Sequence, residues 1–186
     1  IASCLVGSEM CIRDRYRDAQ ALAGADRVHP ADLWPVERRF REPEGAVSRP
    51  PLPYGPEARA RLDAAVLRIV KAGDLKAALS LRDTCLGFVA AQTDRQARAF
   101  WKICAGFFDA FGSGLLPPDV YVKRVASRVL MQYATLAKGD PTIADRLVQD
   151  LLFFCSQAKV ADLAEDAAPS LLSLIHISEP TRQEAI

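Results

Sequence analysis

Apolar residues recur at helical spacing through the central part of the chain, from residue 57 to about residue 155. No stretch shows the strict alternation of apolar and polar residues that is typical of a half-buried β-strand. The pattern therefore predicts an all-α fold. Its clearest example is a row of large side chains that share one helix face: Phe100, Ile103, Cys104, Phe107, Phe108 and Phe111.

Glycine and aspartate mark the boundaries of the first three helices. Gly73 suits the left-handed end of a helix that starts near residue 57, and Asp74 is a favourable N-cap for the second. Thr93 or Asp94 can cap the third, which the Gly-Ser-Gly run at 112–114 should end. For the second helix the spacing predicts a buried face made of Leu75, Ala78, Leu79, Leu86 and Val89.

A fourth and a fifth helix follow. Asp119 comes directly after two prolines and should open the fourth helix. The run Gly139-Asp140-Pro141 should end it, with Pro141 in the first turn of the fifth helix. Since short connections favour antiparallel neighbours, we expect a bundle of about five helices over residues 57–168.

The segment before the bundle has a different composition. Residues 16–25 read as the end of an upstream helix, whereas residues 26–56 contain seven prolines and dispersed charges. Proline fixes φ and removes a backbone donor, so 26–56 is predicted to be a linker or an extended strap. Three large apolar side chains in it should dock on a neighbouring surface: Leu33, Trp34 and Phe40.

Both ends of the chain resemble translated sequencing-library adapter. The run from Leu5 to Arg15 fits one reading frame of such an oligonucleotide, and the run from Leu172 to Arg182 fits its reverse complement. A short signal peptide is the alternative at the start, but Gly7, Ser8 and Glu9 interrupt the apolar run that it needs. We therefore expect residues 1–15 and 172–186 to be non-native and to make few specific contacts.

Composition excludes several classes of function. The 24 Lys and Arg residues nearly balance 23 Asp and Glu residues, which leaves neither a basic stripe for nucleic acid nor an acidic tail. No apolar run reaches the roughly 18 residues of a membrane-spanning helix. Cys85, Cys104 and Cys155 lie in apolar helical surroundings, which is typical of buried thiols in a cytoplasmic protein.

The sequence predicts no catalytic, cofactor-binding or metal-binding residue. His29 precedes Pro30, which disfavours the helical backbone that a phosphoacceptor histidine would have. Cys104 and Cys155 have no base that can be named beside them, so core packing is the better reading. No spacing of His, Cys, Asp or Glu is typical of a metal site, and no cofactor is expected.

Two basic helix faces and one aromatic residue are candidates for a surface role. The basic groups are typical of solvated faces or of docking sites for an acidic partner. Trp101 is expected in the core with the other aromatic residues, but it lies off the main aromatic row and could instead serve an inter-domain contact. The basic groups are Arg59, Arg61 and Arg68 on the first helix, and Lys123, Arg124 and Arg128 on the fourth.

Several stretches together resemble a region of large chemotaxis-like hybrid histidine kinases from twitching-motility pathways, which control type IV pili. They are the runs at 31–34 (ADLW), 100–111 (FWKICAGFFDAF), 115–130 and 145–155. The resemblance covers about residues 26–165. In that family a related helical region lies among histidine phosphotransfer domains and also occurs in scaffold proteins that lack kinase domains.

The resemblance implies a non-catalytic scaffold or spacer region of a two-component signalling kinase, with protein partners in a chemotaxis-like array. Neither nucleic acid nor a membrane span is implied. One alternative is a free-standing helical scaffold protein of the same pathway. Another is a small helical enzyme that uses Cys104 or Cys155.

Overall fold

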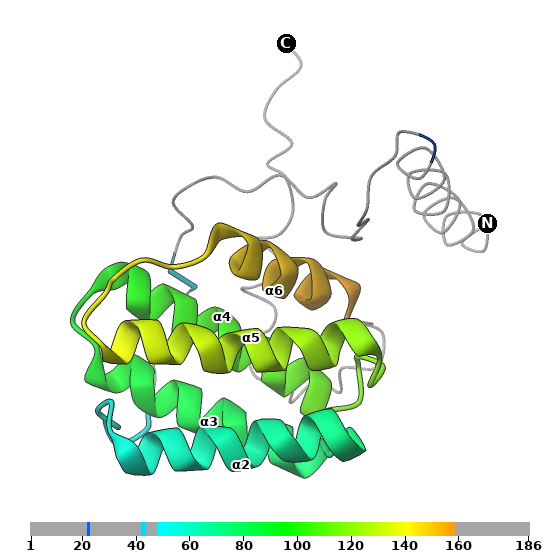
Figure 1. Cartoon of the computed structure of the whole chain (residues 1–186), viewed down its shortest axis with the longest axis horizontal. Helices are drawn as coiled ribbons and strands as arrows, with labels where there is room; N and C mark the ends of the chain where they lie inside the picture. The colour runs from blue at the N-terminus through cyan, green and yellow to red at the C-terminus, as the bar shows by residue number, and fades with distance from the viewer. Residues whose placement is uncertain (1–21, 23–41, 44–47, 159–186) are drawn as a thin grey trace. The chain divides into compact units, whose positions relative to one another are not determined.

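The computed structural model describes Leu22, residues 42–43 and residues 48–158. The chain divides into two compact units, Ile1–Pro35 and Val36–Ile186, and the account below concerns the second. Its described part contains helices and no strand, which confirms the all-α prediction. The helices are α2 (Pro56–Ala72), α3 (Leu75–Ala91), α4 (Arg95–Gly112), α5 (Val120–Ala137) and α6 (Asp145–Gln157), as Figure 1 shows.

Helix α4 provides half of the largest fully buried side chains in the described part of the chain. It packs against α3 and α6, while α2 packs against α3 and α5, and α5 packs against α6. From Phe100 to Phe111 every residue of α4 except Lys102 is buried, so this helix is enclosed on all sides. Each buried Phe stabilises the fold by about 1.5–3 kcal/mol relative to its exposed state. The predicted aromatic row is therefore confirmed as the core.

The predicted caps of the first four boundaries are also confirmed. Gly73 ends α2 in the left-handed conformation with φ 62°, where residues with a Cβ are strained. Three aspartates accept a hydrogen bond from the backbone N–H three residues later, and each such cap contributes about 1 kcal/mol. They are Asp74 to Ala77 (3.0 Å), Asp94 to Ala97 (2.7 Å) and Asp119 to Val122 (2.8 Å).

The predicted start of the last helix is wrong. Helix α6 begins at Asp145 with Ala144 as its N-cap, so Pro141 lies outside its first turn. The side chain of Gln132 on α5 binds the intervening loop, because its Nε2 donates to the Thr142 carbonyl (2.7 Å) and its Oε1 accepts from the Ala144 N–H (3.1 Å). These hydrogen bonds hold the loop in a non-helical conformation that local sequence signals do not specify.

The predicted buried face of α3 is partly wrong. Leu75 is 41% exposed, and Leu79 and Leu86 are only half-buried. The face that packs against its neighbours consists mainly of small residues, which allow close helix contact: Ala77, Ala78, Leu81, Cys85, Gly87, Phe88 and Val89. Hydrophobicity alone predicts that the leucines of α3 are the most deeply buried residues. Close approach of the neighbouring helix backbones instead buries its small residues.

Residues 48–55 form an extended strap that packs on the bundle. The Leu52 N–H donates to the Gly87 carbonyl of α3 (2.9 Å), and a Cβ at Gly87 would lie 2.9 Å from the Leu52 Cβ. The described end of 26–56 is thus docked, and it does not act as a free linker there. Other predictions fall outside the described residues: the segment 16–25 apart from Leu22, both chain ends, His29, Leu33, Trp34 and Phe40.

Candidate protein-interaction surface

Trp101 is buried inside the bundle, so it belongs to the core and the alternative of an inter-domain contact is wrong. Its side chain is 0% exposed, and its Nε1 donates to the hydroxyl of Tyr54 in the strap (2.7 Å). Its ring centroid lies 4.7 Å from that of Phe88 on α3. The strap lies beside α4, and its Tyr54 supplies the partner that a buried indole requires.

The hydroxyls of this aromatic cluster also hold the strap. The Tyr133 hydroxyl of α5 donates to the Gly55 carbonyl and accepts from the Gly55 N–H, both at 3.0 Å. The Tyr54 ring centroid lies 5.4 Å from those of Phe88 and Tyr133. Burial raises the pKa of Tyr54 to about 12, so its hydroxyl is neutral at physiological pH. The cluster is therefore structural.

The three cysteines of the bundle are free and buried. Burial raises the pKa of the Cys155 thiol to about 12, and burial with neighbouring thiols raises the pKa of Cys104 well above its ordinary value. Since the thiolate is the nucleophile, such thiols are inert. Within the described ranges no group of His, Cys, Asp and Glu is arranged to hold a metal ion, and no helix is long and apolar enough to cross a membrane.

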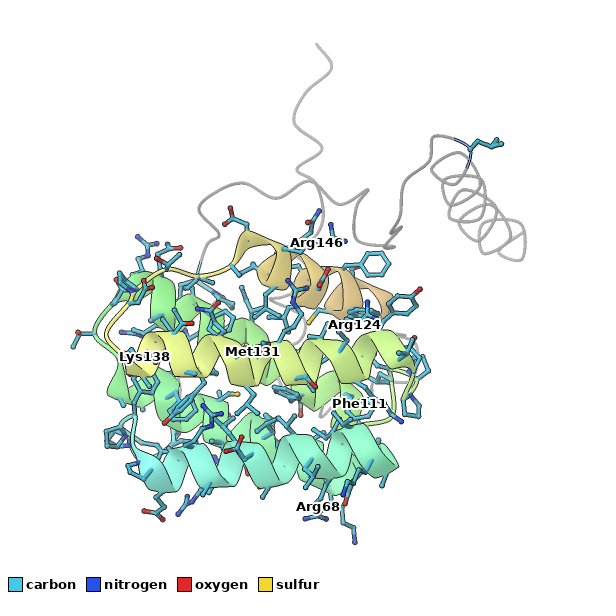
Figure 2. All side chains as sticks on the ribbon, in the orientation of Figure 1. Arg68, Phe111, Arg124, Met131, Lys138 and Arg146 are labelled. Carbon is cyan, nitrogen blue, oxygen red and sulfur yellow. The ribbon has the colours of Figure 1, made fainter. Side chains whose placement is uncertain are left out.

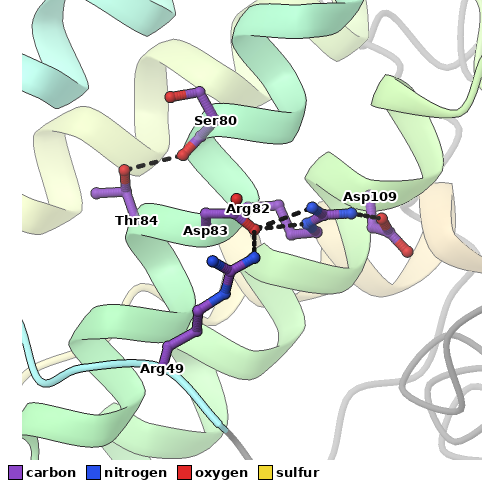
Figure 3. A network of polar contacts seen from close by, with 6 residues as sticks. All are labelled: Arg49, Ser80, Arg82, Asp83, Thr84 and Asp109. Carbon is purple, nitrogen blue, oxygen red and sulfur yellow. Dashed lines mark hydrogen bonds and ion pairs between the residues drawn. The ribbon is translucent and has the colours of Figure 1, made fainter.

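Polar contacts connect the strap, α3 and α4. Arg82 on α3 contacts Asp109 of α4 (2.8 Å) and its own neighbour Asp83 (3.0 Å), and Arg49 of the strap contacts Asp83 (3.0 Å), as Figure 3 shows. Asp109 is 8% exposed, so its charge needs these donors to be tolerated. Every charged group in this network is paired, and the network serves to position the two helices and the strap.

A second charged group connects α5 and α6. Arg128 of α5 forms an ion pair with Asp150 of α6, and Arg146 contacts the same carboxylate (Nε to Oδ1, 3.2 Å). Asp150 is 1% exposed, and removal of one partner from a pair this buried is strongly destabilising. Arg128, one of the predicted surface cations, thus has a structural role.

The basic face predicted on α2 is neutralised by neighbouring carboxylates. Arg59 pairs with Asp63, Arg61 pairs with Glu57, and Arg68 pairs with Asp74, at Nε or Nη to oxygen distances of 3.0, 2.7 and 2.9 Å. All three are exposed pairs, worth about 0–1 kcal/mol each. This face therefore presents a mixed and nearly neutral surface to a partner.

The exposed side of α5 has a different character. Val120 is 61% exposed and Met131 is 71% exposed, and Arg124 and Lys138 lie on the same side of the helix (Figure 2). We call Val120, Lys123, Arg124, Met131 and Lys138 the α5 outer face. The helix contains no Asp or Glu, and no carboxylate of the described residues pairs with Lys123 or Arg124. The Arg124 guanidinium instead lies 6.0 Å from the centroid of the Tyr121 ring.

The three arginines of α2 are paired with carboxylates, whereas Lys123 and Arg124 of α5 have no carboxylate partner among the described residues. Nothing in the sequence separated Arg128 from Lys123 and Arg124, because its partner Asp150 is 22 residues away. Met131 lies seven residues after Arg124, and this helical spacing places both side chains on one side of α5. The arrangement suits protein binding, for which exposed Met, Val and Arg are typical contact residues.

Comparison with known proteins supports an interaction role. A family model described as the second domain of the FimL scaffold protein matches residues 48–174, which include the strap and all five helices. The match ends within the predicted adapter segment and overlaps it by three residues, 172–174. Neither the search of curated proteins nor that of solved structures finds a match. Because the matched residues are more than half of the chain, the protein belongs to the FimL scaffold family.

Proposed function

We propose that this domain is a non-catalytic scaffold of a type IV pilus signalling pathway, and that it holds a protein partner on the α5 outer face. The observation that carries the proposal is the set of unpaired cations and exposed apolar residues on α5, in a bundle whose three arginines on α2 are all paired. The family description as a scaffold protein supports it.

The contacts on the inner side of α5 hold this helix rigidly in the bundle. Gln132, Arg128 and Tyr133 each point from α5 into a different neighbour: the α5–α6 loop, α6 and the strap. Helix α5 is therefore fixed on its inner side while its outer side is available. Binding to a preorganised face avoids the entropy of ordering it, which favours affinity.

The catalytic alternative has no support in the described residues. Cys104 and Cys155 are buried with raised pKa values, and no basic side chain lies in position to deprotonate them. We therefore place the function in binding.

Two kinds of full-length protein are compatible with the proposal. The description of the matched family names a scaffold protein, so we propose as the first candidate a scaffold without kinase domains. We also propose that it acts in the cytoplasm. A chemotaxis-like histidine kinase with a related helical region is the second candidate. The genomic sequence on both sides distinguishes them, because kinase and phosphotransfer domains in the same reading frame would identify the second. The same sequence tests the adapter origin of residues 1–15 and 172–186, which native codons at those positions would contradict.

Charge reversal on α5 in the full-length parent tests the function. Lys123→Glu with Arg124→Glu should reduce twitching motility and surface pili while the protein accumulates to the normal level. Arg95→Glu is the matched control, because Arg95 is an exposed cation at the start of α4. Normal motility in the α5 double variant would contradict the proposal, as would an equal defect in the Arg95 variant.

A further inference from the structure

We propose that the α5 outer face binds an acidic amphipathic helix, in which carboxylates flank a row of apolar side chains. This inference rests on the proposed scaffold function and specifies the chemistry of its partner. It follows from the position of the cations on α5, from the spacing of the exposed residues and from the exclusion of two other occupants.

The cations of α5 lie where they do not stabilise the isolated helix. Lys123 and Arg124 are the fourth and fifth residues of α5, near the positive end of its dipole. Cations are favourable near the C-terminal end of a helix and unfavourable near the N-terminal end. The first turn of α2, in contrast, contains Glu57, and its last turn contains Lys71. Carboxylates from a partner would pair with both cations and also interact favourably with the dipole.

The spacing along the face matches a partner helix. Val120, Arg124, Met131 and Lys138 are separated by four, seven and seven residues, which keeps them in one row along α5. At about 1.5 Å per residue the row extends for about 27 Å. Met131 lies between Arg124 and Lys138, so the partner should place apolar side chains against Met131 and Val120 and carboxylates toward Arg124 and Lys138. Met is well suited to such a contact, since its flexible thioether adapts to different apolar surfaces.

A second copy of this chain does not fit the same face. A symmetric dimer centred on Met131 would place Arg124 of one copy near Lys138 of the other, with no carboxylate of α5 between them. Like charges in such a contact oppose association.

Nucleic acid also does not fit. The net charge of the chain is +1, and Lys123, Arg124 and Lys138 are too few for a phosphate-binding surface. An acidic protein segment needs only two or three such cations, and it also uses the exposed apolar side chains.

Binding of designed peptides to the full chain tests the inference. The probe is a fluorescently labelled helical peptide of four turns with a leucine row flanked by glutamates, and its partner probe has lysine in place of every glutamate. In fluorescence anisotropy the glutamate peptide should bind, and it should bind at least tenfold more tightly than the lysine peptide. Equal binding of both, or none of either, would overturn the inference.

Substitutions locate the binding on α5. Lys123→Glu with Arg124→Glu and, separately, Met131→Ser should each weaken binding of the glutamate peptide at least tenfold. Arg95→Glu should change it less than twofold. The thermal midpoint of the Lys123/Arg124 double variant should be unchanged or raised, since the substitution replaces cations near the positive end of the dipole. Equal weakening by Arg95→Glu would assign the effect to general charge and refute the site.

The outcome separates this inference from the proposed function. If charge reversal abolishes motility but the glutamate peptide does not bind, the α5 outer face has another partner and only the acidic-helix inference fails. If neither effect is found, the scaffold role of this face fails as well. Sedimentation of the full chain, alone and with the peptide, should show one chain per complex, and a dimer that Lys123→Glu disrupts would favour self-association instead.

Discussion

Replacement of Tyr54 by Phe isolates one buried hydrogen bond. The substitution keeps the ring in the aromatic cluster but removes the oxygen that accepts from Trp101 Nε1 at 2.7 Å. Trp101 is 0% exposed, so its N–H would remain buried without a partner, at a cost of about 1–3 kcal/mol. Taking about 2 kcal/mol, the thermal midpoint should fall by roughly 5 °C for a domain of this size. Urea unfolding followed by far-ultraviolet circular dichroism measures the loss.

A double-mutant cycle with Trp101→Phe tests whether the hydrogen bond is the cause. In the Trp101→Phe background no donor is left, so Tyr54→Phe should cost about 1–2 kcal/mol less than in the wild type. The urea m-value should stay unchanged in all variants, since the surface exposed on unfolding is the same. A loss below about 0.5 kcal/mol for Tyr54→Phe, or equal losses in the two backgrounds, would refute the assignment of the Trp101 contact.

Three other predictions concern the core. Asp150→Asn should destabilise the domain by about 1–3 kcal/mol in urea, because Arg128 and Arg146 lose the buried carboxylate that they contact, and a loss below about 0.5 kcal/mol would contradict this. Between about pH 10 and 12 the unfolded state loses the Tyr54 proton while the folded state keeps it, so wild-type stability should fall with rising pH more steeply than that of Tyr54→Phe; parallel curves would refute this. In the Cys4→Ser, Cys11→Ser variant no thiol should react rapidly with a disulfide reagent until guanidinium is added; a fast-reacting thiol in the native chain would support a catalytic cysteine.

The sequence predicted features that depend on neighbouring residues. The caps at Asp74, Asp94 and Asp119 need only a backbone N–H three residues away, and the stop at Gly73 needs only a left-handed residue. The aromatic row of α4 could be predicted because helical spacing alone places its members together. Each of these signals is complete within a few residues of the chain.

Features that depend on packing could not be predicted in the same way. The start of α6 is decided by Gln132, which lies 12 residues before the N–H of Ala144 that it accepts from. Burial of Trp101 could not be separated from an inter-domain contact, because the strap residue that accepts from it is 47 residues away. The α5 outer face could not be predicted for the same reason. The sequence shows three cations on α5, but only the structure shows that Arg128 is paired with Asp150, whereas Lys123 and Arg124 have no carboxylate partner among the described residues.

Photocrosslinking from α5 in cells tests the scaffold role most directly. Benzoylphenylalanine replaces Met131 in the full-length parent, and the same residue at position 95 is the control. The proposal predicts a discrete protein adduct from position 131, which disappears when Lys123 and Arg124 are changed to Glu and is missing from position 95. An adduct that persists after charge reversal, or no adduct from position 131 in cells that assemble type IV pili, would contradict a partner-binding role for the α5 outer face.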